Sequence, residues 1–309
     1  MSETKTNLRE AEAIIKTTGI LSEKNLEEVT VDGKKVIRGT LVIQTSEENF
    51  TTYNVYVNEL KNDGTENSAY KGVKTVLDEY KSIAEVGREE ADYVSVSKGR
   101  ISPNTYFRGG RHDNIRYQTS YFNRFTPKED TVFGSEFSIE MFIKSIVPEM
   151  AKDEEGEMAE TGRVVVNGWI PTYNGIEPIA LIAPVEDDIA EGVTDSYEVG
   201  QTVAFYGNCV NSKHVEIIEK PVKIGKPKRE EKVTYKNEFI ITGASDAFDA
   251  EEGRYVPYDA DAINAAITER DLKLKEMEEA DKKGGNAKSN TGTGVGSKPP
   301  VSNRKFPNF

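Results

Sequence analysis

The 309-residue chain has 53 acidic and 40 basic side chains, a net charge of −13, and only 36% hydrophobic residues. It is long enough for two domains and a tail, and its start is polar with no run of 18 apolar residues. We therefore expect neither a membrane-spanning helix nor a signal peptide. Cys209 is the single cysteine, which rules out an internal disulfide and is typical of the reducing cytoplasm. With so few histidines and cysteines, we expect no structural zinc and no cofactor.

Two nine-residue stretches resemble each other: GKKVIRGTL at 33–41 and GRVVVNGWI at 162–170. Each has a turn glycine, a basic residue, a short strand with β-branched residues and a second glycine, Gly39 or Gly168. A glycine inside a strand usually marks a bulge or a sharp bend, the device that coils a sheet into a small barrel. The match predicts an internal duplication, with Gly39 and Gly168 at equivalent bends.

The elements expected on either side of these stretches also repeat. The first half predicts strands over 13–21, 36–45, 50–60, 92–101 and 115–125, with an amphipathic helix over 69–84 between the third and the fourth. The second half predicts strands over 136–147, 162–173, 177–185, 200–210 and 213–220, with a short helical turn over 187–197. A further strand over 233–245 either completes the second set or covers its edge.

Five short strands with a helix between the third and the fourth is the order of the OB fold. A β-sandwich would not predict that helix at the same place twice. We therefore predict a mainly β chain with two OB-fold-like five-stranded barrels in tandem. The expected domains are 11–130 (first barrel), 135–245 (second barrel), 246–281 (acidic loop and C-terminal helix) and 282–309 (flexible basic tail).

Residues 98–128 reverse the overall charge, with seven cations against one acid, Asp113. Aromatic side chains are interleaved with these cations. Arginine and lysine bind the phosphates along a nucleic-acid backbone, while aromatic faces stack on unpaired bases, at about 1–3 kcal/mol per base. The sequence RGGR at 108–111 falls at the tip of the hairpin between the fourth and fifth strands, a ligand-binding edge of this barrel. The alternative is that half of the aromatics fill the core and the arginines pair with acids elsewhere.

The second half offers fewer candidates. Trp169 follows the bend glycine, and it either projects as a stacking platform or fills the barrel core. The predicted nucleic-acid-binding residues are Lys98, Arg100, Tyr106, Phe107, Arg108, Arg111, Arg116, Tyr117, Tyr121, Arg124, Trp169 and Tyr173. Of Tyr53 and Tyr56, at most one can point at a ligand, because they lie on opposite faces of one strand.

The sequence gives no indication of an enzyme. The acidic stretch 246–253 lacks the ligand spacing of a calcium loop and is expected to be a solvated loop. Neither His112 nor His214 has a serine or cysteine partner in a recognisable motif. We therefore expect no catalytic residue and no metal site.

The chain resembles the single-stranded-DNA-binding proteins encoded by tailed bacteriophages. The resemblance lies within 11–245, in GILSEKNL, VIRGTLVIQT, AYKGVKTVLDEYKSIA and NGWIPTYNG. It implies a non-catalytic protein that coats unpaired DNA during phage replication or recombination in the host cytoplasm. It also implies a tail whose tip recruits replication or recombination proteins. Arg304 and Lys305 make this tip basic where the familiar bacterial tip is acidic, so the tail could instead touch DNA or the protein's own acidic surface.

The main alternative is a phage structural or protein-interaction module built on β-barrels that does not bind nucleic acid. A nuclease is a third hypothesis, and the scarcity of histidine argues against it. The expected partner is single-stranded DNA rather than a membrane. Whether one barrel or both bind DNA, the site size and the oligomeric state are left open by the sequence.

Overall fold

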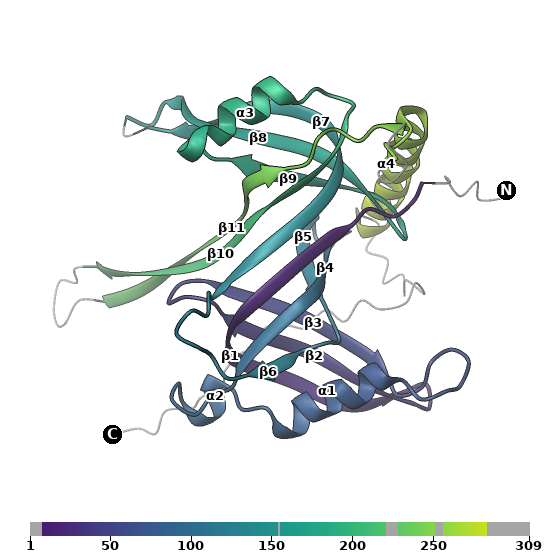
Figure 1. Ribbon diagram of the computed structural model, residues 1–309, viewed down its shortest axis with the longest axis vertical. Coiled ribbons are helices and arrows are strands. Elements are labelled where there is room, and N and C mark those ends of the chain that lie inside the picture. Colours follow the sequence, from purple (N-terminus) through teal and green to yellow (C-terminus); the bar gives the residue numbers. More distant parts are fainter. Residues whose placement is uncertain (1–7, 154, 221–227, 251–255, 283–309) are drawn as a thin grey trace.

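The computed structural model describes residues 8–153, 155–220, 228–250 and 256–282. The strands are β1 (Ala13–Val31), β2 (Lys34–Gln44), β3 (Phe50–Asn58), β4 (Tyr93–Phe107), β5 (Arg111–Gln118), β6 (Asn123–Phe125), β7 (Gly134–Lys152), β8 (Met158–Thr172), β9 (Gly175–Ala183), β10 (Thr202–Lys220) and β11 (Lys228–Ala244). The helices are α1 (Ser68–Glu79), α2 (Ile83–Val86), α3 (Ile189–Ser196) and α4 (Ala260–Lys282), with a 3-10 turn at Glu186–Asp188. The predicted mainly β class is confirmed (Figure 1).

The strands pair in two closed sets that have the same topology. In the first ring β1 pairs with β2, β2 with β3, β3 in parallel with β5, β5 with β4, and β4 with β1. In the second ring β7 pairs with β8, β8 with β9, β9 in parallel with β11, β11 with β10, and β10 with β7. The repeated order agrees with the duplication that the two nonamers indicate.

The two rings are fused into one sheet, so the expectation of two separate barrels in tandem is wrong in this respect. Strands β1 and β7 pair in antiparallel fashion, from Ala13 opposite Ile139 to Thr18 opposite Gly134. This pairing joins all the strands into one 11-stranded sheet. It is possible because β2 pairs with β1 only from Ile20 onward, which leaves one edge of residues 13–18 free while β4 occupies the other. Figure 1 shows β1 and β7 lying side by side between the two halves.

Several element predictions need correction. The strand expected over 115–125 is interrupted, since β5 ends at Gln118 and β6 begins at Asn123. The stretch 213–220 is not a fifth strand but the continuation of β10, whose backbone stays paired with β11 out to Lys220 and Lys228. Strand β11 is instead the fifth strand of the second ring. The helix expected over 69–84 ends at Glu79, because Tyr80 has extended backbone angles, and a separate turn of helix begins at Ile83.

Gly39 and Gly168 both permit a close approach between the first two strands of their rings. A Cβ atom on Gly39 would collide with the carbonyl oxygen of Asn25 on β1, and this glycine also has a φ of +140°. A Cβ atom on Gly168 would lie 2.8 Å from the carbonyl oxygen of Phe142 on β7. Each glycine therefore lets β2 or β8 bend tightly against the strand before it.

One hydrophobic cluster extends through both rings, from Ile37 and Leu41 on one side to Ile139 and Phe205 on the other. Buried hydroxyl groups link the rings within it. Thr17 Oγ1 lies 2.7 Å from the Tyr53 hydroxyl and 2.9 Å from Ser135 Oγ, which is 2.8 Å from Thr51 Oγ1. Each hydroxyl has a partner, so their desolvation is compensated.

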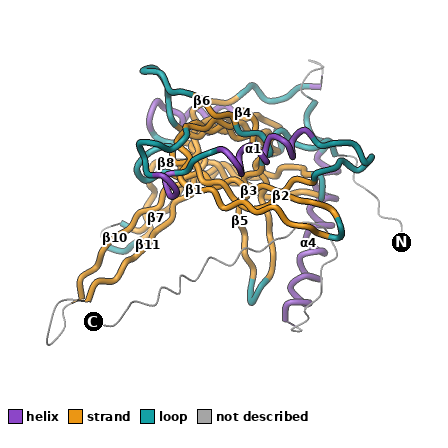
Figure 2. The backbone as a smooth tube through the Cα atoms, turned by 90° about the horizontal axis from the view of Figure 1, so that it is seen from below, coloured by secondary structure: helices purple, strands orange, loops and turns teal. Residues whose placement is uncertain are grey.

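Helix α4 packs on the second ring through a separate apolar cluster. Ile263 and Ala266 of the helix, together with Tyr258, contact Trp169 and Ile176 of the sheet. Figure 2 shows α4 and the β4–β5 hairpin projecting together from the body. The predicted tail 282–309 lies outside the described residues, apart from Lys282 at the end of α4.

None of the described helices has the length and apolar character needed to span a membrane.

Replacing Gly39 with alanine is expected to lower the free energy of unfolding by about 2–5 kcal/mol, since it adds backbone strain to a steric clash. The matched control is Gly72→Ala in the exposed middle of α1, where the new methyl group meets no atom within 4 Å. That change is expected to raise the free energy of unfolding by about 0.5–1 kcal/mol. Urea unfolding of both variants measures the difference. Equal effects would contradict the close approach at Gly39.

Candidate functional site

The β4–β5 hairpin has two faces with different surroundings. At its base Ile101 and Tyr117 are opposite each other and point into the first ring. Because side chains alternate along a strand, the pairs Arg100–Gln118 and Ser102–Arg116 point outward. The register continues this outward side to Asn104 opposite Asn114 and Tyr106 opposite His112. The other side carries Thr105 opposite Asp113 and Phe107 opposite Arg111, and it faces α4.

The outward side of the hairpin continues across β3 and β2. Asn54 of β3 is in register with Gln118 of β5 and with Thr40 of β2. One step along, Tyr56 lies opposite Arg38. We call this surface the open face; it consists of Arg38, Thr40, Asn54, Tyr56, Arg100, Tyr106, Arg116 and Gln118. It brings together cations, amides and aromatic rings on one side of the sheet.

A cleft of about 600 Å³ lies at the edge of the open face, between the two rings. Its walls come from β4, from the segment after β5, from the start of β1 and from the end of β8. Lys98, Arg100 and Tyr121 supply its cations and its aromatic ring, and Glu10 and Glu12 supply its acids. The Tyr121 side chain is 64% exposed. The cleft therefore has both charges and an accessible ring.

Three of the predicted cations have carboxylate partners. Arg100 pairs with Glu10, and Arg111 donates from Nε to Asp113 Oδ2 over 3.0 Å. Arg124 lies at the far end of β4, where its guanidinium is 3.5 Å from Asp92 and rests on the ring of Tyr80. Its position on β6 separates Arg124 from the open face. The alternative expected from the sequence, that arginines pair with acids elsewhere, therefore holds for Arg100 and Arg124, whereas Arg111 pairs with Asp113 of the same hairpin.

The remaining predicted cations are less constrained. Lys98 and Arg108 are exposed and Arg116 is half-buried. Within the described ranges, the side chains of these three residues have no carboxylate partner, whereas Arg38 on the same face is held 2.8 Å from Glu27. Lys98 and Arg116 thus provide uncompensated positive charge at the cleft and on the open face.

The predicted aromatic residues divide between surface and core. Tyr117 is buried inside the first ring, where its hydroxyl donates to Asn211 Oδ1 over 3.1 Å and burial raises its pKa. The expectation that Tyr117 contacts a ligand is therefore wrong. Tyr106 stacks on His112 with ring centroids 5.1 Å apart, and Phe107 is half-buried. Tyr173 is 81% exposed on the β8–β9 turn.

Trp169 is also in the core, and its alternative role as a stacking platform needs correction. The side chain is 8% exposed beneath α4. Lys144 Nζ lies 5.2 Å and Arg270 Cζ 5.8 Å from its ring. A second cleft, of about 540 Å³, opens beside it and is also lined by Arg111. Because α4 and two cations cover the ring, no base can stack on Trp169 in this arrangement.

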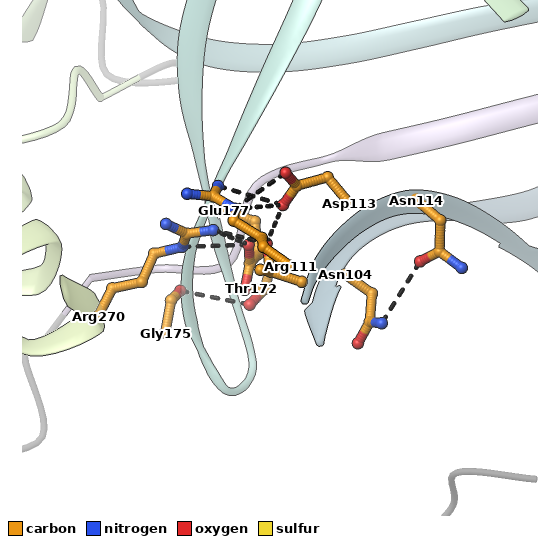
Figure 3. Close-up of polar contacts among 9 residues, drawn as sticks. Asn104, Arg111, Asp113, Asn114, Thr172, Gly175, Glu177 and Arg270 are labelled. Carbon is orange, nitrogen blue, oxygen red and sulfur yellow. Dashed lines mark hydrogen bonds and ion pairs between the residues drawn. The ribbon is translucent and has the colours of Figure 1, made fainter. Parts of the chain in front are cut away.

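Arg270 fastens α4 to the second ring by an ion pair and to the first ring by a hydrogen bond; the ion pair is drawn in Figure 3. Arg270 donates from Nε and from its terminal nitrogen to Glu177 Oε2 of β9, over 3.1 and 2.9 Å. The same terminal nitrogen is 2.9 Å from Thr105 Oγ1 of β4. Burial raises the pKa of Glu177, and the hydrogen bond and charge of Arg270 offset only part of that rise. Arg270 thus ties the helix to the second ring and to the hairpin.

Several open-face residues were not among the sequence candidates. Arg38 and Asn54 were not identified, although alternation in FTTYNVYVN showed that only one of Tyr53 and Tyr56 could face a ligand. That inference is confirmed, since Tyr53 is fully buried and Tyr56 is 39% exposed. Period-two alternation could have identified Asn54 as outward, but only the strand register places it beside Gln118.

No group of three or more histidine, cysteine, aspartate or glutamate side chains in the described part of the chain is arranged to hold a metal ion.

Comparison with known proteins gives one family assignment. The family model YorF matches residues 12–280, so the chain belongs to the YorF family. No curated protein matches it significantly.

Solved structures resemble it only distantly. The wild-type single-stranded DNA binding protein from Thermus aquaticus superimposes with a TM-score of 0.45 at 10% identity, covering 78% of this chain and 96% of that one. A deletion mutant of the same protein gives 0.44 at 9% identity, with 78% and 97% covered. A replication protein A heterotrimer bound to ssDNA gives 0.21 at 9% identity, with 89% and 71% covered. With TM-scores below 0.5, none of these similarities assigns a ligand to this chain.

The burial of Trp169 can be tested directly, because it is the only tryptophan. Its emission is expected to be blue-shifted and weakly quenched by acrylamide. Ile263→Ala removes a fully buried contact of α4, at a cost of about 2–5 kcal/mol, and should increase quenching and shift the emission to the red. Leu272→Ala, at an exposed position of the same helix, is the control and should change neither. Strong quenching of the unmodified protein would contradict the packing of α4.

Proposed function

We propose that this member of the YorF family binds single-stranded DNA with little sequence preference and without catalysis. The observation that carries the proposal is the open face, where the register of four strands gathers Arg116, Tyr56 and Asn54 beside the cleft that holds Lys98 and Tyr121. Uncompensated cations suit the phosphates of a nucleic acid, and exposed rings suit its unpaired bases.

The proposal includes a fold interpretation. We regard each ring as an OB-type barrel, with approximate boundaries of 11–130 and 135–245, because both rings share the 1-2-3-5-4-1 pairing order and a helix after the third strand. The open face then corresponds to the outer side of strands two and three and of the hairpin between strands four and five. In OB folds these are the elements that bind oligonucleotides.

The side chains of the open face suit a single strand better than a duplex. Tyr56 and Tyr121 offer flat rings on which bases stack, which requires that the bases be unpaired. Arg116 and Lys98 offer charge for the backbone that links these bases. Asn54 and Gln118 can donate to or accept from any base edge, so they add contacts without strict discrimination. Weak sequence preference follows from this composition.

The net charge of −13 limits long-range attraction to DNA. Binding therefore depends on local contacts with the few free cations. Three phosphate contacts, from Lys98, Arg108 and Arg116, would give a salt slope of about −2 on a single strand. A strongly basic protein would give a much steeper slope.

The biological setting is a further part of the proposal. A role in coating DNA during phage replication or recombination, in the host cytoplasm, follows from the sequence resemblance alone. The tail that would recruit other replication or recombination proteins lies outside the described residues.

A fluorescence-polarisation titration with labelled oligo(dT) over a series of salt concentrations tests the proposal. We expect saturable binding at low salt that weakens as salt rises, with a logarithmic slope of about −2. The protein should leave the oligonucleotide intact in the presence of divalent metal. Absence of binding at low salt would reject the proposal in favour of a protein-interaction module, and metal-dependent cleavage would indicate a nuclease.

Two substitutions locate the site on the open face. Arg116→Glu is expected to weaken oligo(dT) binding about tenfold, equivalent to about 1.4 kcal/mol, and to lower the salt slope. Tyr56→Ala should weaken binding about fivefold or more because one base stack is lost. Lys128→Glu makes the same charge change as the first variant in the exposed loop after β6, and it should alter affinity less than twofold. Equal effects of Arg116→Glu and Lys128→Glu would show that only overall charge matters.

A further inference from the structure

The tip of the β4–β5 hairpin presents two consecutive backbone donors to one anion. Gly109 N donates to Asp281 Oδ1 and Gly110 N donates to Asp281 Oδ2, each over 3.1 Å. The φ angles of these glycines are +65° and +135°, conformations that other residues rarely adopt. Successive amides turned to the same side form a concave nest that binds anions. In this structure a carboxylate from the last turn of α4 occupies the nest.

We propose that the amides of Gly109 and Gly110 form a binding site for one phosphate group of single-stranded DNA, and that Asp281 fills this site until DNA displaces it. The inference rests on the proposed function and adds to it a backbone subsite and an internal competitor. It concerns neither the open-face side chains nor the cleft at the base of the hairpin.

The chemistry of the tip matches a phosphate. A phosphodiester offers two non-bridging oxygens that share one negative charge, as the Asp281 carboxylate does, so both can accept from the two amides. Arg108, next to the glycines, adds positive charge, since it is exposed with no carboxylate partner among the described residues. The charge of Arg111 is already paired with Asp113, 3.0 Å away. A bound phosphate therefore gains hydrogen bonds and positive charge together.

The contact of Asp281 with the two amides does not depend on the packing of the rest of α4. Helix α4 is anchored by Ile263 and Arg270. At a rise of 1.5 Å per residue, Arg270 is about 16 Å from Asp281 along the helix axis. Asp281 can therefore leave the amides while Arg270 stays on Glu177 and α4 stays on Trp169. Both glycines are exposed, so displacement requires no rearrangement of the core.

The tip is placed to extend the open face. Arg108 lies two residues after Tyr106, whose ring belongs to that face, and Gly110 is six residues from Arg116 along the chain. Six residues of strand span about 20 Å. A single strand that lies along the hairpin can therefore contact Arg116 with one phosphate and the nest with another.

Asp281→Asn provides the first test, because it removes the charge and keeps the shape of the side chain. With the competitor weakened, affinity for oligo(dT) is expected to rise about threefold to tenfold at low salt, as fits the loss of a charged hydrogen-bond acceptor. Glu276→Gln removes one negative charge from an exposed position of the same helix and should change affinity less than twofold. Equal gains from the two variants would overturn the proposal, since they would report only the net charge.

A second measurement observes the nest itself. In protein labelled with ¹⁵N-glycine, inorganic phosphate added to the Asp281→Asn variant should shift the amide resonances of Gly109 and Gly110, and should shift them less in the unmodified protein. Gly33, an exposed turn glycine with φ +76°, is the internal reference and should not move. Shifts spread over all exposed glycines, or none at the tip, would overturn the anion site.

The two proposals fail in different ways. If Asp281→Asn leaves the affinity unchanged while Arg116→Glu still weakens binding, the nest is not a DNA subsite and the proposed function stands. If no form of the protein binds oligo(dT), the proposed function is rejected, and with it the DNA phosphate as the ligand of the nest. Phosphate-induced shifts at the tip without DNA binding would identify a site for small anions only.

Discussion

The antiparallel pairing of β1 with β7 is the constraint on which the rest of the structure depends. It places Thr17 beside Ser135 inside the sheet, where the two hydroxyls bond to each other and to Tyr53 and Thr51. Separating the rings would leave such buried groups without partners, at about 1–3 kcal/mol for each. The pairing therefore fixes the relative position of the rings. Because the cleft between them is bounded by β1, β4 and β8, its shape follows from this junction.

The rings share a topology but differ at the residue that follows the bend glycine of the second strand. In the first ring this residue is Thr40, which is polar, lies in register with Asn54 and leaves the outer surface open. In the second ring it is Trp169, whose exposure to water would cost several kcal/mol, so that surface needs an apolar cover. Helix α4 supplies the cover with Ile263 and Ala266. One substitution within the repeat thus accounts for why the first ring keeps an open face and the second carries a helix.

The sequence predicted the features that depend on local residue patterns. It did not predict the features that depend on contacts between distant residues. Alternation and the repeated glycines predicted the strands and the duplication, because both are properties of neighbouring residues. The edge pairing of β1 with β7 left no local signal, so fusion into one sheet could not be foreseen. For the same reason Tyr117 looked like a surface aromatic: its strand alternates, but only the register shows which side is inside. The pairing of Arg100 with Glu10 joins residues 90 positions apart, beyond the reach of any motif.

Acidic side chains of the chain contact basic groups of the open face and the backbone amides at the hairpin tip. Carboxylates of the protein occupy groups that the proposed function assigns to phosphates: Glu10 pairs with Arg100, Glu27 with Arg38, and Asp281 accepts from the amides of the tip. The two exposed ion pairs, of Arg100 and of Arg38, contribute about 0–1 kcal/mol each, so they hold the side chains in place without blocking exchange. A single small anion gains little by displacing one of them. A polyanion that displaces several at once gains their sum within one binding event, as linked sites do. If the chain binds DNA as we propose, such an arrangement favours a long strand over free phosphate or nucleotides, although the chain as a whole is negatively charged.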